Sequence, residues 1–173
     1  APGDPFEAAA ATTALASMSG PAYLRLGRAG ERKVHASPPS FAIGKAILLR
    51  DGGDCTLIAT GAVLALAADA AENLSAAGID VRLISMHTLN PLDEKIIRDA
   101  VETEVVVTIE EHGPGGLASS VAEILVGSSV RFAPIRLKAG AQIVTDTQEG
   151  LRARQGLTVD GIIQTVQKLL SEK

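Results

Sequence analysis

The sequence predicts a three-layer α/β fold, in which a doubly wound and mainly parallel sheet has one antiparallel edge strand. Three observations predict it. From Lys45 onward, apolar runs and amphipathic segments follow in the order β-β-α-β-α-β-α-β-loop-α, which is typical of a parallel sheet covered on both faces. The run VVVTI at 105–109 is apolar throughout, as in a strand buried on both faces. Two apolar runs joined by DGGD at 51–54 indicate a hairpin, which would supply the antiparallel edge strand.

The first unit of the chain is predicted to be a helix followed by a strand. Asp4 is the expected N-cap, Pro5 occupies the first helical position, and Glu7 is placed for a capping box. Gly20 and a following proline end the helix, and AYLRL at 22–26 has the composition of a strand. A helix and a strand with nothing before them are typical of the end of a larger domain.

These patterns divide the chain into three parts. Residues 1–26 are the expected tail of a truncated domain. Residues 27–44 contain glycine, adjacent prolines, serines and charges without any period, so they are expected to form a linker. Residues 45–173 contain the complete α/β alternation and are expected to form one domain.

The elements of this domain have recognisable ends. Gly78 is a C-cap signal, and Asn90 followed by Pro91 is a helix start signal. From Thr158 an apolar stripe with helical spacing marks the last helix. The strands are predicted at 46–50, 55–60, 79–85, 105–109 and 131–137, and the helices at 63–78, 90–103, 117–125 and from Thr158 onward.

Composition excludes several classes of function. The net charge is −4 and aromatic residues are few, which argues against nucleic-acid binding. The longest apolar run is interrupted by glycine and acidic residues before it reaches the length of a membrane span, so no membrane is expected. Cys55 is the single cysteine, which favours a reduced, cytoplasmic setting and provides neither a disulfide within the chain nor a Cys/His metal cluster.

The corner TIEEHGPGGLASS at 108–120 joins a predicted strand to a predicted helix. Backbone N–H groups at such a helix start can bind an anion. However, the glycine spacing is not G-x-G-x-x-G, and no Gly-Lys-Ser/Thr follows. A tight crossover that needs glycine is therefore the favoured interpretation.

The polar residues of this corner are Glu110, Glu111 and His112. They could form an acid–base group at the carboxyl end of a strand. Adjacent side chains on extended backbone point to opposite faces, so at most two of them converge, and no nucleophile lies nearby. An interface or cleft role for Glu111 and His112 is therefore favoured over catalysis.

His87 follows another predicted strand and either lines a cleft or caps the next loop, with the cap favoured. No catalytic residue and no metal site are predicted.

Several phrases together resemble the transketolase family: GPAYLRLGR, DCTLIATG, AGIDVRLISMHTLNPLD, and EEH followed by GG. The resemblance covers nearly the whole chain, and the order and spacing of the phrases make it fairly specific. It is nearest to the C-terminal part of a transketolase, or to the shorter transketolase subunits that carry the pyrimidine-binding and C-terminal domains. Deoxyxylulose-phosphate synthase and the β subunits of 2-oxo-acid dehydrogenases share this C-terminal domain and stay as alternatives.

The resemblance implies a transferase of the pentose phosphate pathway that depends on thiamine diphosphate and Mg²⁺ and moves a two-carbon ketol unit between sugar phosphates. Residues 1–26 would be the end of the pyrimidine-binding domain. The activating glutamate and the diphosphate–magnesium motif would lie upstream, so this fragment alone is expected to be inactive and to hold no cofactor. It would contribute to subunit assembly, either in a homodimer or in a complex with a second transketolase subunit. A non-catalytic Rossmann-like assembly module is the rival interpretation.

The resemblance also implies one substrate-binding residue. The last arginine of GPAYLRLGR, Arg28, matches the position where transketolases hold a basic residue for the sugar phosphate. The family usually has glutamine at the next position, whereas this chain has Ala29. Arg25 is the competitor, and it should point to the other face if the strand is regular. The alternative for Arg28 is a solvated charge at the start of the linker.

Overall fold

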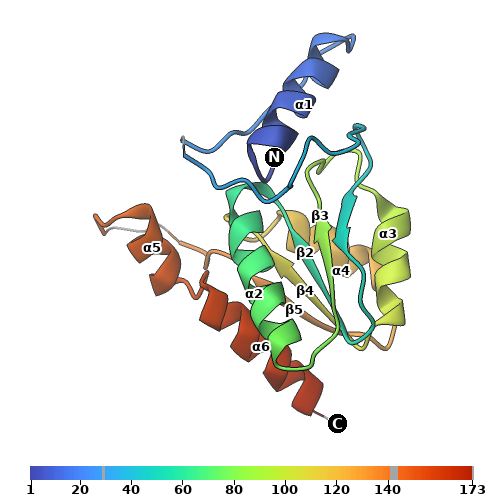
Figure 1. Cartoon of the computed structure of the whole chain (residues 1–173), viewed down its shortest axis with the longest axis vertical. Helices are drawn as coiled ribbons and strands as arrows, with labels where there is room; N and C mark the ends of the chain where they lie inside the picture. Colours follow the sequence, from blue (N-terminus) through green and yellow to red (C-terminus); the bar gives the residue numbers. More distant parts are fainter. Residues whose placement is uncertain (29, 141–143, 173) are drawn as a thin grey trace.

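The computed structural model describes residues 1–28, 30–140 and 144–172. A five-stranded sheet in the order β1-β3-β2-β4-β5 forms its centre. Strands β2 to β5 are parallel, and β1 runs antiparallel to β3 at one edge. This architecture confirms the predicted fold class (Figure 1). The strands are β1 (Ile47–Arg50), β2 (Cys55–Ala59), β3 (Val81–Ser85), β4 (Val105–Ile109) and β5 (Arg131–Ile135).

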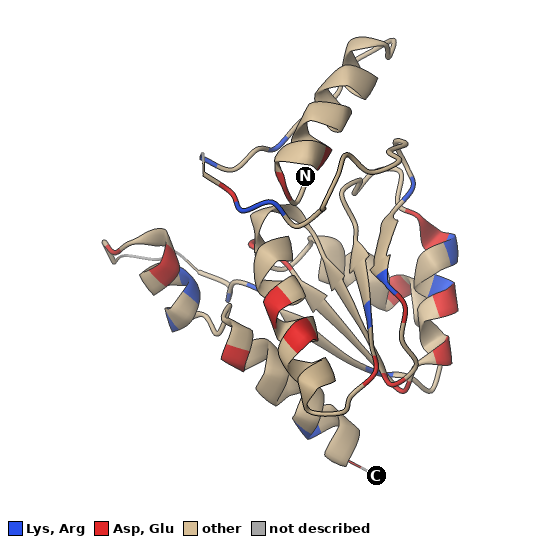
Figure 2. Cartoon of the chain, in the orientation of Figure 1, with Lys and Arg blue, Asp and Glu red and all other residues tan. Residues whose placement is uncertain are grey.

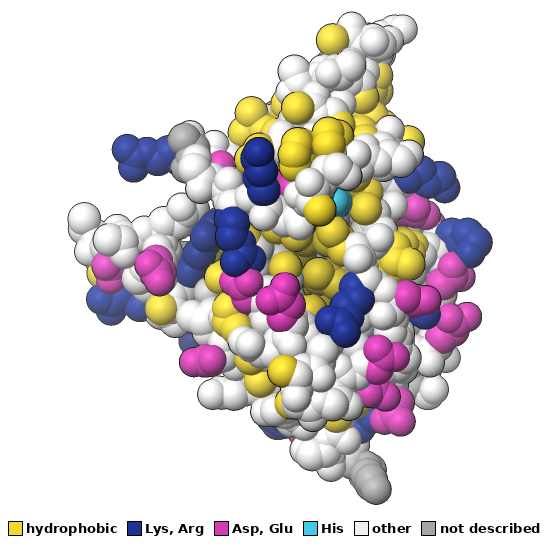
Figure 3. All heavy atoms as spheres, in the orientation of Figure 1, with side chains coloured by type: hydrophobic (Ala, Val, Ile, Leu, Met, Phe, Trp, Pro, Cys, Tyr) yellow, Lys and Arg dark blue, Asp and Glu magenta, His cyan; other side chains and the backbone are white. Residues whose placement is uncertain are grey.

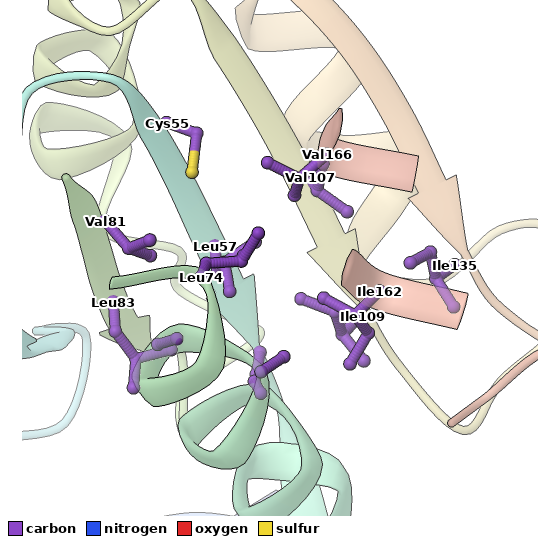
Figure 4. Close-up of a cluster of buried hydrophobic side chains, with 14 of the residues drawn as sticks. Cys55, Leu57, Leu74, Val81, Leu83, Val107, Ile109, Ile135, Ile162 and Val166 are labelled. Atoms are coloured by element: carbon purple, nitrogen blue, oxygen red, sulfur yellow. The ribbon is translucent and has the colours of Figure 1, made fainter. Parts of the chain in front are cut away.

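Helices cover both faces of the sheet, and their side chains form two separate cores. Helices α2 (Leu64–Ala76) and α6 (Val159–Ser171) pack on one face, and α3 (Glu94–Asp99) and α4 (Leu117–Ile124) pack on the other. Neighbouring residues of β2 alternate between these cores: Leu57 belongs to the first and Ile58 to the second. Figure 4 shows the first core, where Ile162 and Val166 of α6 meet side chains of β4. The apolar stripe predicted for the last helix is therefore confirmed.

The hairpin predicted at 51–54 is wrong, because β1 pairs with β3 and not with β2. The glycines bring this turn against the start of β3. A Cβ on Gly52 would lie 2.4 Å from the carbonyl carbon of Val81. The Gly53 N–H donates to the Asp80 carboxylate at 2.8 Å, and the Asp80 N–H donates to the Asp54 carboxylate at 2.7 Å. The turn thus crosses β3, which takes the place between β1 and β2.

Two helices differ from their predicted bounds. α3 begins at Glu94 rather than after Asn90. Asn90 and Pro91 form a bend before the helix, and the peptide bond between them is cis. The Asp93 carboxylate accepts the Ala46 N–H at 3.1 Å, which fixes the start of α3 beside β1. Helix α5 (Gln148–Arg154) lies in a segment that was predicted to be a loop. Gly78, with a φ of 85°, follows α2 as predicted.

Helix α1 (Pro5–Ala16) begins as predicted and projects away from the sheet (Figure 1). Asp4 accepts the Glu7 N–H at 2.9 Å, so the predicted N-cap is confirmed, while the Glu7 carboxylate accepts the Gly3 N–H. The strand predicted at 22–26 is wrong. This segment pairs with no other strand in the described part of the chain, and an extended segment without a partner forms no ladder.

The start of α1 is joined to the linker. One oxygen of the Asp4 carboxylate accepts the N–H groups of Val34 and His35 at 3.0 and 3.1 Å, and the buried Glu7 carboxylate lies 2.8 Å from His35 Nε2. Burial raises the pKa of Asp4, but the hydrogen bonds from the backbone of Glu7, His35 and Val34 outweigh burial and hold the pKa below its ordinary value. His35, for which the sequence indicates no role, thus fastens the linker to α1.

The Cys55 thiol is expected to be unreactive while the protein is folded. Burial, helped by the carboxylates of Asp54 and Asp80, raises the pKa of this thiol to about 12. The nucleophile in alkylation is the thiolate, so iodoacetamide at pH 8 should label Cys55 only after denaturation. Mass spectrometry in the presence and absence of urea measures this directly, and rapid labelling of the native protein would contradict the burial of Cys55.

Charged side chains lie mostly on the outer surfaces of the helices and on the loops (Figure 2). Among the helices of the described residues, none combines the length and the apolar character needed to cross a membrane.

Candidate functional site

A cavity of about 590 Å³ opens at the carboxyl edge of the parallel strands. The chain runs from β2 to β3 on one side of β2 and reaches β4 on its other side, so the sheet has its topological switch point between β2 and β4. Ligands of open α/β sheets bind at this place. The cavity lies there: Thr60 and Gly61 follow β2, and Glu110 to His112 follow β4.

Glu110 closes the bottom of this site. Its side chain belongs to a residue that is only 1% exposed, and its two oxygens accept the N–H groups of Leu117 and Ala118, both at 2.8 Å. These are the first two residues of α4. A carboxylate at a helix N-terminus satisfies free N–H groups and interacts favourably with the helix dipole. Glu110 is therefore the cap of α4, and it is not available as a general acid or base.

Gly116 makes this cap possible. A Cβ on Gly116 would lie 2.1 Å from the Glu110 carboxylate and 2.9 Å from His112 Nδ1. Only glycine lets the carboxylate reach the helix start at this close approach. The predicted tight crossover is the observed arrangement, and Glu110 occupies the position that an external anion would take.

Glu111 joins three segments that are far apart in the sequence. Arg152 of α5 forms a two-pronged ion pair with its carboxylate, with N–O distances of 3.1 and 2.7 Å. The Gln148 amide also contacts this carboxylate at 3.4 Å. The Glu111 carbonyl accepts a hydrogen bond of 3.1 Å from the Arg25 guanidinium. Two-pronged pairs of this type are strong and orient both partners.

His112 and His87 line a second cavity, of about 600 Å³, between the N-terminal arm (residues 1–26) and the sheet edge. His112 is exposed, lines both cavities and lies 2.9 Å from the Gly113 carbonyl through Nδ1. His87 is buried, and its ring stacks on Phe41 with 4.0 Å between the centroids. Burial lowers the pKa of His87, which keeps its imidazole neutral.

The structure places the predicted site residues in two groups. Glu111 and His112 lie at the switch-point cavity, and His87 lies beneath the arm. Arg28 is exposed on the linker and lines neither cavity, and none of the ion pairs found among the described residues includes it. Arg25 lines both cavities, although the sequence favours Arg28 over it.

Arg152 and Gln148 were not predicted as site residues, because their segment was predicted to be a loop and not a helix. A start signal was present. Thr147 caps α5 by accepting the Gly150 N–H at 3.0 Å, Glu149 lies in the first turn and Arg152 in the last.

The residues at the sheet edge do not fit a magnesium-diphosphate group. The described residues contain no cluster of three or more His, Cys, Asp or Glu side chains that could bind a metal ion. The carboxylates of Glu110 and Glu111 are already satisfied by α4 and by Arg152. We therefore derive no chemical step through this cofactor from these residues.

Fold and site together define a doubly wound α/β domain whose switch-point cavity is lined by carboxylates that are already bonded within the chain. The model of the family described as transketolase, C-terminal domain, matches residues 44–162. The chain belongs to this family.

The chain is also similar in sequence to individual known proteins. The chain is 35% identical to 6-deoxy-6-sulfo-D-fructose transketolase subunit SqwH of Clostridium sp. (strain MSTE9), across 99% of this chain and 54% of that protein. It is 36% identical to 1-deoxy-D-xylulose-5-phosphate synthase of Desulforudis audaxviator (strain MP104C), across 74% of this chain and 21% of that one.

A solved structure described as a split gene transketolase, inactive beta4 tetramer, superposes with a TM-score of 0.88 at 34% identity, across 98% of this chain and 56% of its own. The chain thus spans about half the length of SqwH and of the solved subunit, and a smaller part of the synthase.

Proposed function

We propose that this chain is the C-terminal portion of a transketolase that depends on thiamine diphosphate and Mg²⁺ and transfers a two-carbon ketol unit between sugar phosphates. The observation that carries the proposal is a transketolase C-terminal domain in which both carboxylates at the switch-point cavity are already bonded within the chain. Because Glu110 and Glu111 are held by α4 and α5, this edge of the sheet favours domain contacts over catalysis. The chain would contribute assembly and substrate positioning, and the reacting groups would lie elsewhere.

The N-terminal arm supports an assembly role. Its exposed hydrophobic side chains include Met18, Tyr23 and Leu26, which are 47%, 87% and 55% exposed, and Figure 3 shows hydrophobic side chains gathered on this part of the surface. Apolar groups collected at one place mark an interaction surface. In the proposed division, residues 1–26 complete a pyrimidine-binding domain, 27–44 are the linker and 45–173 are the C-terminal domain.

The proposed partner is a second transketolase subunit or a second copy of the chain in a homodimer. Names of relatives support association, since one is a subunit and another forms a tetramer. The proposed location is the cytoplasm, where a protein with one buried thiol needs no disulfide. The similarity to 1-deoxy-D-xylulose-5-phosphate synthase supports that enzyme as the second candidate.

The chain alone is expected to bind thiamine diphosphate no tighter than millimolar in the presence of Mg²⁺, because the diphosphate needs a site of oxygen ligands for the metal. Isothermal titration calorimetry of the chain measures this, with the longer protein that includes the upstream sequence as the control. Micromolar binding of thiamine diphosphate at one site of the chain alone would contradict the proposal that the cofactor is bound outside this chain. Ketol transfer by the longer protein with its partner subunit, assayed with sugar phosphates, tests the activity itself.

A further inference from the structure

Two arginines on either side of Arg28, one at the end of the N-terminal arm and one in the linker, hold the chain against the C-terminal domain. Arg25 donates to the Glu111 carbonyl at 3.1 Å. Arg32 donates to the Ala65 carbonyl at 3.0 Å and to the Asp69 carboxylate at 2.6 Å. The first contact reaches the β4–α4 corner and the second reaches α2, so the chain around Arg28 is tied to two rigid elements.

The acceptors of both contacts are themselves fixed. The carbonyl of Glu111 follows the buried cap residue Glu110, and the side chain of Glu111 is held by Arg152. Ala65 and Asp69 belong to α2, whose opposite face is buried in the first core. A hydrogen bond to a fixed acceptor restricts its donor, and so it limits the positions that the linker can take.

Arg28 lies between these two contacts in the sequence. The Glu31 side chain packs against Gly27, since a Cβ on Gly27 would lie 1.6 Å from Glu31 Oε1. Arg28 is exposed and is not paired with any carboxylate in the described residues. Its fork of donors therefore remains available for a phosphate.

We infer that Arg25 and Arg32 are positioning residues, through which the C-terminal domain sets the place of Arg28 and so the affinity for the substrate phosphate. The inference rests on the proposed function. It gives the domain a role in substrate binding although the domain contributes no reacting group. Preorganisation of this kind lowers the entropy that an arginine loses when it binds.

Each contact is weak by itself. The side chains of Arg32 and Asp69 are 54% and 36% exposed, and ion pairs at such sites contribute little. The decisive variant is therefore the double replacement Arg25→Gln with Arg32→Gln. The matched control is Arg98→Gln, which removes an exposed ion pair of 3.1 Å to Glu94 on α3, at the opposite face of the sheet.

The first readout is the ¹⁵N–¹H heteronuclear NOE of the amides at 26–28 in the chain itself, because a low NOE reports a mobile backbone. The double variant should lower the NOE of these amides relative to the wild-type chain, and Arg98→Gln should not. Unchanged NOE values would overturn the inference whatever the protein catalyses, so this test does not depend on the proposed function.

The second readout is kinetic and uses the longer protein with its partner subunit. The double variant should raise KM for a phosphorylated sugar by about 3- to 10-fold with kcat unchanged, as for two exposed contacts. KM for hydroxypyruvate should stay the same. Arg32→Asp alone should also raise KM, and adding Asp69→Arg should lower KM again, because the ion pair between positions 32 and 69 is rebuilt even though the hydrogen bond to the Ala65 carbonyl is not. Failure of that rescue would overturn the positioning role, whereas absence of ketol transfer in the wild type would overturn the proposed function instead.

Discussion

Replacing Glu110 with alanine is expected to lower the free energy of unfolding by about 2–4 kcal/mol, because hydrogen bonds to a charged group and buried unsatisfied donors both carry large costs. The carboxylate accepts the N–H groups of Leu117 and Ala118 and belongs to a residue that is only 1% exposed. Alanine leaves both N–H groups without an acceptor and opens space beneath the corner. The effect should be among the largest of any polar residue of this chain.

Urea unfolding followed by circular dichroism measures this change, with the midpoint and the slope compared between variants. Glu123→Ala on the same helix is the control. Glu123 is exposed, so its replacement should change stability by less than about 0.5 kcal/mol. Glu110→Gln keeps one acceptor oxygen, so its loss of stability should lie between those of Glu110→Ala and Glu123→Ala. Equal stability of Glu110→Ala and Glu123→Ala would show that α4 does not depend on this cap.

The sequence predicts what depends on local patterns. The continuous apolar run at 105–109 is the buried inner strand β4, and Thr158 begins the last helix as its N-cap. Periodicity reports burial on one face or two, and cap residues report helix ends, so these features need no knowledge of distant contacts.

Features that depend on distant contacts were predicted less well. DGGD has the composition of a hairpin turn, and only the packing of Gly52 on Val81 shows that the turn crosses β3. The composition of 22–26 favours a strand, but a strand needs a neighbour to pair with.

At the candidate site, too, the local features could be predicted from the sequence and the features that depend on distant contacts could not. The glycine requirement of the corner is visible in the sequence, whereas the use of Glu110 as a cap is not. No spacing rule links Glu110 to the N–H groups of α4 across the GPGG turn, or Glu111 to Arg152 across about 40 residues, since the fold brings them together.

The assignment of Arg28 came from the resemblance, and the preference for Arg28 over Arg25 rested on a regular strand at 22–26, which would have pointed the two side chains to opposite faces. That strand is absent, so this reason no longer holds. The observed contacts supply another reason to prefer Arg28 over Arg25. The Arg25 guanidinium is engaged with the Glu111 carbonyl, whereas Arg28 is exposed and has no carboxylate partner within the described residues. Arg28 therefore remains the proposed anchor for the sugar phosphate, with Arg25 beside it as a positioning residue.

In the longer protein with its partner subunit, Arg28→Ala is expected to raise KM for phosphorylated sugars by about 10- to 150-fold, which corresponds to ~1.5–3 kcal/mol for a hydrogen bond to a charged group. Steady-state kinetics with a phosphorylated sugar and with hydroxypyruvate, which has no phosphate, measures the effect. KM for hydroxypyruvate should change little, because only the phosphate contact is removed. Arg28→Lys should lose less than alanine, since it keeps the charge but not the planar fork. Equal losses for both substrates, or no loss for either, would show that Arg28 is a solvated charge of the linker and that the phosphate is bound elsewhere.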